Sequence, residues 1–269
     1  MFRSTTSRTT LFIAIAVLLT APAVRADRLS DKDVKALIER IDNERDRFED
    51  QLDGKLKRAI LSSPRGEVNV EQFLDDLQEN VDRLKERFSA DSSASAEVST
   101  LLLQGSAIYR FMSTQPADLD GASEWNRLSA SLRQLAAAYG TTLPVPDGQQ
   151  ARRMNDREVK KAAEALAESA DRFKKDLDTV LKSDATVDKA RREAAVKELD
   201  GLKQDAKKLA SLVGDGRPAS GEAKALLDRA ARVRVASSAW PLTPAAKTAW
   251  APVESGLDNV ARAFELPAR

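Results

Sequence analysis

Apolar residues recur every three or four positions along most of the chain, the spacing that places them on one face of an α-helix. The clearest case lies between residues 70 and 88, where the alternation predicts one apolar stripe packed against a partner helix. The stripe consists of Val70, Phe73, Leu74, Leu77, Val81, Leu84 and Phe88. No segment alternates with the period of two that is typical of a half-buried strand. The pattern therefore predicts an all-α protein without strands.

The first half of the chain divides into four such helices, separated by short polar segments. The first helix is predicted to begin after Ser30, because Asp33 follows three residues later and completes a capping box. We expect this helix to continue to Ile60, until residues 62–66 end it with their Ser, Pro and Gly. The fourth helix is predicted to stop before Gly140, which suits the left-handed residue that often ends a helix.

The sequence also repeats itself, because residues 29–139 align with residues 154–264 without gaps at an offset of 125. Shared helical spacing alone would not also align a proline between helices and a lone tryptophan. The clearest matches are Asp46-Arg47-Phe48 with Asp171-Arg172-Phe173, Ser30 and Asp33 with Asn155 and Glu158, Pro116 with Pro241, and Trp125 with Trp250. The sequence therefore predicts an internal duplication.

Four amphipathic helices joined by short loops usually form an antiparallel bundle. We therefore expect two tandem antiparallel four-helix bundles, at residues 27–139 and 154–269. Residues 140–153 are predicted to be the linker between them, because residues 140–148 are rich in Gly and Pro. The alternative is that part of the linker is helical, since residues 149–153 would tolerate a helix. Alanines replace several larger core residues in the second bundle, so we expect it to bury less apolar surface.

The first 26 residues have the order of a secretory signal peptide: a basic start, a short apolar run and small residues before a cleavage site. As a helix, residues 11–24 would measure about 21 Å, which is short for a hydrocarbon core of about 30 Å. We expect cleavage after Ala26, with Ala23 as the alternative site. The sequence thus predicts an exported protein, periplasmic or extracellular, without a transmembrane helix once the signal peptide is removed.

Composition narrows the possible chemistry. The chain contains 43 Lys and Arg, 42 Asp and Glu, no His and no Cys. Zinc fingers, Ser-His-Asp triads, cysteine nucleophiles and disulfides all require one of the two missing residue types. Removal of the signal peptide would leave 40 basic and 42 acidic residues, so there is no basic surplus of the kind that binds nucleic acid. We predict no catalytic residue, no metal site, no cofactor and no nucleic-acid partner.

Three residues of the second repeat are candidates for contact with a partner. Trp240 lies in a predicted loop, and its counterpart in the first repeat is Gln115. Arg229 and Arg232 belong to a small basic cluster on the third helix, together with Arg234. Each has a structural alternative, because a loop tryptophan can cover a bundle end and arginines near a helix C-terminus favour the helix dipole.

Other shared residues are interpreted as structural. Trp125 and Trp250 stand at helical spacing from apolar residues, which indicates a place in the core rather than ligand stacking. Arg47 and Arg172 lie beside the apolar stripe, where charges are usually solvated.

The last helix of each repeat carries one motif, Trp125-x2-Leu128-x3-Leu132-x2-Leu135-Ala136-x2-Tyr139, echoed from Trp250 to Phe264. This motif resembles the closing helix of certain uncharacterised exported bacterial helical proteins. The resemblance implies export and a helical fold, and it carries no activity or binding residue.

These observations together predict an exported, non-catalytic binding or scaffold protein of the bacterial envelope, whose partner is an unknown protein or envelope component. One alternative is a carrier of a small ligand or lipid, held in the lighter second bundle. A second is an envelope chaperone with an exposed apolar groove. A carboxylate-dependent enzyme is the least favoured, because it would need convergent groups in a pocket.

Overall fold

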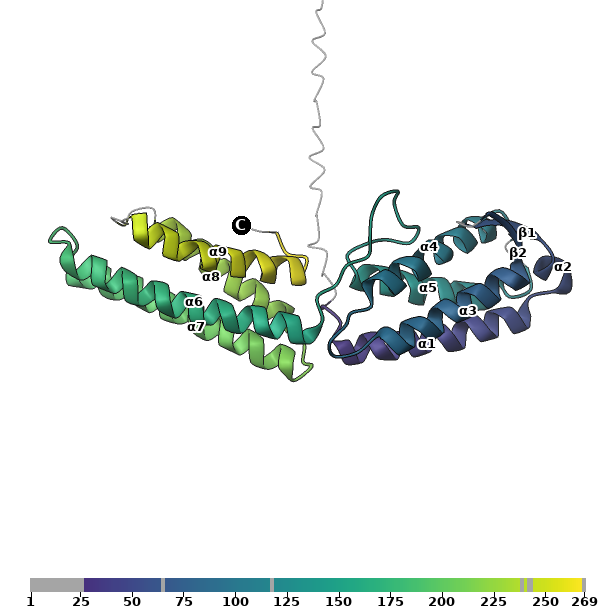
Figure 1. Cartoon of the computed structure of the whole chain (residues 1–269), viewed down its shortest axis with the longest axis horizontal. Coiled ribbons are helices and arrows are strands. Elements are labelled where there is room, and N and C mark those ends of the chain that lie inside the picture. Colours follow the sequence, from purple (N-terminus) through teal and green to yellow (C-terminus); the bar gives the residue numbers. More distant parts are fainter. Residues whose placement is uncertain (1–26, 64–65, 117–118, 238–239, 241–243, 268–269) are drawn as a thin grey trace, which may run out of the picture.

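The computed structural model describes residues 27–63, 66–116, 119–237, 240 and 244–267. The predicted signal peptide lies outside the described residues. Most of the described chain is helical, which confirms the all-α prediction. The helices form two elongated groups that meet end to end (Figure 1). We refer to α1–α5 with the strands as the first unit, and to α6–α9 as the second unit.

In each unit, four long helices pack in a ring. In the first unit, α1 contacts α3 and α5, and α4 contacts the same two helices; in the second unit, α6 and α8 each contact α7 and α9. The first unit contains α1 (Asp31–Gln51), α2 (Gly54–Lys57), β1 (Ile60–Ser63), β2 (Gly66–Asn69), α3 (Val70–Arg87), α4 (Ser95–Met112) and α5 (Ala122–Ala138). The second contains α6 (Asp156–Ser183), α7 (Lys189–Gly214), α8 (Ser220–Ser237) and α9 (Pro244–Ala263). None of these helices carries an apolar stretch long enough to cross a bilayer.

Each unit has its own apolar core, and one aromatic pair is present in both. The rings of Phe48 and Trp125 lie 5.6 Å apart, and those of Phe173 and Trp250 lie 4.9 Å apart. Both tryptophans are buried, so they fill the cores as predicted. Tyr139, which ends the motif of the first unit, is also buried and donates its hydroxyl hydrogen to Ser93 O at 2.5 Å.

Both predicted capping boxes are present. Ser30 Oγ accepts the Asp33 N–H at 3.2 Å, and the Asp33 carboxylate accepts the Ser30 N–H at 3.2 Å. Asn155 and Glu158 make the same two contacts at 2.8 and 2.9 Å. These caps satisfy backbone donors that would otherwise lack partners at the starts of α1 and α6.

The prediction of one helix as far as Ile60, and of no strands, is wrong. Helix α1 ends at Gln51, Asp53 caps the short α2, and β1 pairs with β2 in an antiparallel hairpin. Gly54 explains the early end of α1, because glycine disfavours the interior of a helix. The second unit has Thr at the equivalent position, and its first two helices are longer.

The segment predicted as a linker packs on the first unit. Leu143, Val145 and Ala151 are buried in the first apolar core. The Val145 N–H donates to Ser106 Oγ at 2.9 Å, which fixes the segment to α4. We call residues 140–151 the strap. Gly105 of α4 lies beneath it, since a Cβ there would stand 3.3 Å from Leu143 Cδ1.

Candidate functional site: the junction of the two units

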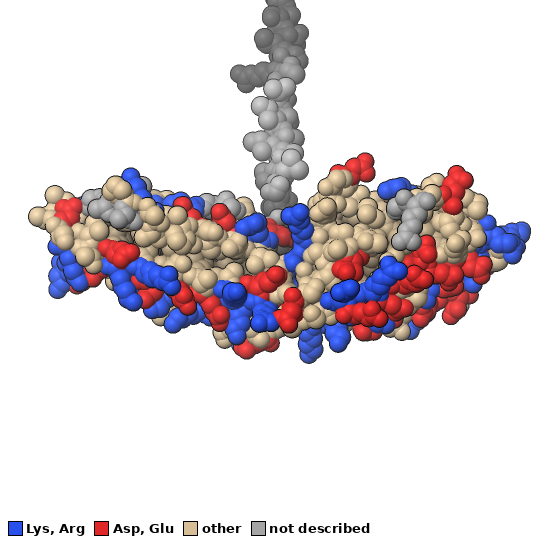
Figure 2. Space-filling view, in the orientation of Figure 1, with Lys and Arg blue, Asp and Glu red and all other residues tan. Residues whose placement is uncertain are grey.

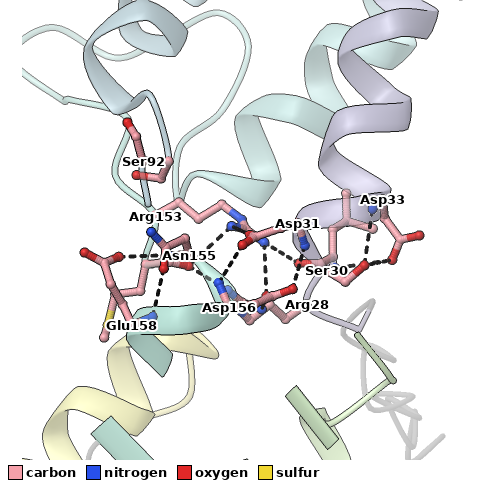
Figure 3. A network of polar contacts seen from close by, with 12 residues as sticks. Arg28, Ser30, Asp31, Asp33, Ser92, Arg153, Asn155, Asp156 and Glu158 are labelled. Carbon is pink, nitrogen blue, oxygen red and sulfur yellow. Dashed lines mark hydrogen bonds and ion pairs between the residues drawn. The ribbon is translucent and has the colours of Figure 1, made fainter. Parts of the chain in front are cut away.

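The two units meet where α1 and α6 begin (Figure 3). Asp31 and Asp156 are the first residues of these helices. The Asp31 N–H donates to Asp156 Oδ2 at 2.8 Å, and the Asp156 N–H donates to Asp31 Oδ2 at 2.8 Å. Each helix N-terminus, which carries a partial positive charge, thus receives a carboxylate from the other helix.

Two arginines cross the junction in opposite directions. Arg28 donates to Asp156 Oδ1 at 2.5 Å and to Met154 O at 2.6 Å. Arg153 forms an ion pair with Asp31 and donates to Leu29 O at 2.6 Å. The Arg153 side chain is 3% exposed and the Arg28 side chain 11%. Both arginines therefore interact with carboxylates in a largely desolvated setting, where an ion pair depends strongly on keeping both members.

Every one of these contacts has a counterpart at the same offset of 125 residues. The equivalent pairs are Arg28 and Arg153, Leu29 and Met154, Ser30 and Asn155, and Asp31 and Asp156. Reciprocal contact, in which residue i of one unit touches residue j of the other and the reverse, is the mark of a twofold symmetric interface. The junction thus has the geometry of a symmetric dimer contact within one chain.

Burial shapes the electrostatics of this network. It is the main cause that lowers the pKa of Arg28, and the neighbouring Arg153 lowers it further, while Asp156 opposes both. The Arg28 guanidinium also lies 5.8 Å from the centre of the Phe264 ring, a cation–π contact with the end of the second unit. The two arginines and two aspartates balance in charge.

Two cavities have junction residues in their walls. One of about 80 Å³ is lined by Arg28, Asp33 and Phe264, among others. Another of about 460 Å³ lies between the units, and both Arg262 and Glu265 line it. Both have charges of both signs in their walls. Within the described residues, no three potential metal ligands of the His, Cys, Asp and Glu type come together.

Two shifted pKa values outside the junction have an ion pair or a helix cap as their cause. Hydrogen bonds from Lys203 and then Lys175 hold the pKa of Asp171 far below its usual range. Backbone N–H groups of the α2 cap lower the pKa of Asp53. Groups of this kind stabilise helix surfaces.

Arg229, one of the predicted partner contacts, links two helices instead. Its Nε donates to Asp205 Oδ2 at 2.6 Å, and Nη1 lies 3.4 Å from Glu198 Oε2. The hydrogen bond to Asp205 is the main cause that raises the pKa of Arg229. In the first unit the equivalent positions are Asn80 and Gln104, a buried pair joined by a hydrogen bond of 2.9 Å. Both units therefore join their second and third long helices through one polar pair at the same place.

The structure does not bring the predicted contact residues together in one cluster. Arg232 is exposed, and among the described residues it donates only to Asp228 O of its own helix, at 3.3 Å. Arg234 lies 3.6 Å from Glu254 of α9. Trp240 is half-buried and packs against the second apolar core. Of the three candidates, Arg232 projects furthest from the unit's own packing.

Sequence reasoning missed the junction. Its residues fall within the aligned starts of the two repeats, which read Arg-Leu-Ser-Asp at 28–31 and Arg-Met-Asn-Asp at 153–156. The signal that could have pointed to the junction is the presence of an arginine and an aspartate, three residues apart, at the start of both repeats. It did not reveal that the two copies face each other.

Comparison of the chain with protein-family models, curated proteins and solved structures finds no match.

Proposed function

We propose that the protein is an exported, non-catalytic scaffold of the bacterial envelope, which presents two helical units at a fixed spacing to a protein partner or envelope component. The reciprocal junction is the observation that carries this proposal. Two largely buried ion pairs, and two hydrogen bonds from backbone N–H groups to carboxylates, hold the starts of α1 and α6 together. A rigid spacing strengthens binding to a partner that contacts both units, because less freedom is lost on association.

The distribution of charge supports the same proposal. Figure 2 shows Lys, Arg, Asp and Glu gathered along the side formed by α1, α3, α6 and α7. Helix α1 has 13 charged residues in 21 and α6 has 14 in 28, whereas α4 has two in 18 and α9 has four in 20. One long side of the molecule is therefore strongly solvated, and the other is better suited to contacts with a partner.

We further propose that the two units arose by duplication of one bundle. The equal offset of the junction contacts, of the aromatic pairs and of the caps supports this origin. The carrier and chaperone alternatives rest on sequence composition alone. In the described part of the chain, four cavities lie at the junction or between charged helix surfaces.

The test begins with chemical cross-linking of the mature chain in native envelopes, followed by purification of the captured partner. Its affinity is then measured for the wild type and for a variant with a weakened junction, Arg153→Met. We expect saturable binding that falls by about tenfold or more in the variant, if both units engage the partner. Equal binding of the two proteins would contradict the fixed-spacing proposal. Turnover of a hydrolase substrate, abolished by a single carboxylate substitution, would contradict the non-catalytic role.

A further inference from the structure

Helices α4 and α8 occupy equivalent places in the two units, but the structure covers their outer faces differently. The strap crosses α4, where Ser106 and Ala107 are 0% and 5% exposed. The equivalent residues of α8 are Ala231, which is half-buried, and Arg232, which is exposed. A face that is covered in one unit is thus open to solvent in the other, within the described residues.

The strap shows what kind of segment suits this face. It is a non-helical stretch with alternating apolar residues and prolines, Leu143-Pro144-Val145-Pro146. Its apolar side chains are buried against the first core, and the Val145 N–H donates to Ser106 of the helix. Prolines restrict the backbone of such a segment before it binds, which lowers the entropy lost when it is ordered.

The second unit keeps the framework around the open face. Gly140 lies just after α5 and has a φ of 67°, and Glu265 lies just after α9 and has a φ of 52°. In both units, the N–H of the next residue donates a hydrogen bond to a carbonyl of the preceding helix. Thr141 N–H donates to Ala136 O at 3.0 Å, and Leu266 N–H donates to Ala261 O at 2.9 Å. The second unit therefore keeps the local geometry that accompanies a covered face in the first.

The chemistry of the open face differs from that of α4. Val235 is 75% exposed, and it lies four residues after Ala231 on the same side of the helix. Lys224 on this face pairs with Asp228 at 2.5 Å. Within the described residues, Arg232 donates to the Asp228 carbonyl and pairs with no carboxylate. The face offers a short apolar strip beside one exposed cation.

We propose that the outer face of α8, defined by Ala231, Arg232 and Val235, binds an extended segment of a partner protein, as the strap binds the positions of α4 that are equivalent to Ala231 and Arg232. The segment carries apolar residues with proline, which cover Ala231 and Val235, and an acidic side chain that pairs with Arg232. This inference rests on the proposed scaffold function and names the class of partner for one of its surfaces.

A synthetic peptide with the sequence of residues 140–151 is the probe, because it contains Leu143, Val145 and Asp147. The mature protein already covers α4 with its own strap, so binding of the added peptide reports on other surfaces. Fluorescence anisotropy of the labelled peptide measures the affinity. One control peptide replaces Leu143 and Val145 by Ser, and another replaces Asp147 by Lys.

We expect saturable binding of the unmodified peptide and at least about tenfold weaker binding of both control peptides. Arg232→Glu and Val235→Asp should each weaken binding by a similar factor. Lys197→Glu, the same charge change at an exposed position of α7, should leave the affinity unchanged. Circular dichroism establishes that the variants are folded.

Absence of binding at about 1 mM peptide, a level that would still reveal a very weak complex, overturns the proposal. Binding that is equal in the Arg232→Glu, Val235→Asp and wild-type proteins also overturns it, because the peptide then binds elsewhere. Neither result affects the scaffold proposal, which is tested with a partner captured from the envelope and with the junction variant.

Discussion

Asp31 and Asp156 each accept the backbone N–H of the other, at 2.8 Å in both directions. The first residue of one helix is thereby part of the cap of another helix that begins 125 residues away. An aspartate at the first turn normally stabilises its own helix. Here the two carboxylates also join two separate cores.

The junction should contribute strongly to stability. Arg153→Met removes the ion pair between the buried Arg153 side chain and the half-buried Asp31. We expect it to lower the free energy of unfolding by about 3–5 kcal/mol, because a largely desolvated charge loses its partner. Urea unfolding followed by circular dichroism measures the change. The matched control is Arg157→Met, since Arg157 pairs with Asp91 where both side chains are 72% exposed. This control should cost less than about 1 kcal/mol. Equal losses for the two variants would contradict a stabilising junction.

The strap should depend on Ser106. Its hydroxyl accepts the Val145 N–H in a fully buried position. Ser106→Ala leaves that N–H without a partner and is expected to cost about 1–3 kcal/mol. Hydrogen exchange of the Val145 amide should accelerate in the variant, while exchange in α6 should not change. Ser113→Ala, at the exposed end of α4, is the control. An unchanged Val145 exchange rate would show that the strap is held by other contacts.

Arg229 and Asp205 should behave as a coupled pair. Arg229→Gln leaves the Asp205 carboxylate without its 2.6 Å partner, whereas Arg229→Gln with Asp205→Asn recreates the pair found at Gln104 and Asn80. We expect the double variant to recover at least about 1 kcal/mol relative to the sum of the single variants. Thermal or urea unfolding of the four proteins completes the cycle. Additive effects of the two substitutions on the free energy of unfolding would mean that the interaction between Arg229 and Asp205 does not stabilise the protein.

Asp171 should affect stability in a pH-dependent way. Its pKa in the folded protein is lowered from 3.8, chiefly by hydrogen bonds from Lys203 and Lys175. A lowered folded-state pKa stabilises the protein above the unfolded value, and this contribution is lost as the pH falls below it. Asp171→Asn should therefore be less stable than the wild type at pH values well above 3.8, and the difference should shrink in more acidic solution.

Urea midpoints measured across this pH range test the expectation for Asp171. Asp176→Asn, at an exposed position of the same helix, is the control. A difference between Asp171→Asn and the wild type that stays constant with pH would refute the assignment.

Local features of the fold could be predicted from the sequence. The capping pairs at Ser30 and Asn155, and the places of Trp125 and Trp250, follow from side-chain type and helical spacing within a few residues. The hairpin was missed because it consists of two four-residue strands, which are too short to show a clear period of two. The strap was missed because an extended, proline-containing segment has no period, and Gly and Pro indicate a loop equally well.

The site was the least predictable part. Arg229 was expected at the surface, but Gly201 on α7 leaves the space that its guanidinium fills, since a Cβ there would lie 2.4 Å from Arg229 Nη1. The fit of Arg229 against Gly201 involves two helices, so the sequence of either helix alone does not predict it. The junction residues Arg28 and Arg153 likewise precede the predicted helices, where a polar side chain gives no sign of a contact. Their contact depends on how two units meet.

The twofold contact at the start of α1 and α6 has one further consequence. In a homodimer such a contact dissociates on dilution, and any substitution changes both halves at once. On a single chain the two halves stay together at any protein concentration. Each half can also acquire its own substitutions, as the hairpin in one and the uncovered α8 in the other illustrate. A symmetric contact at the centre is thus compatible with two ends that recognise different molecules.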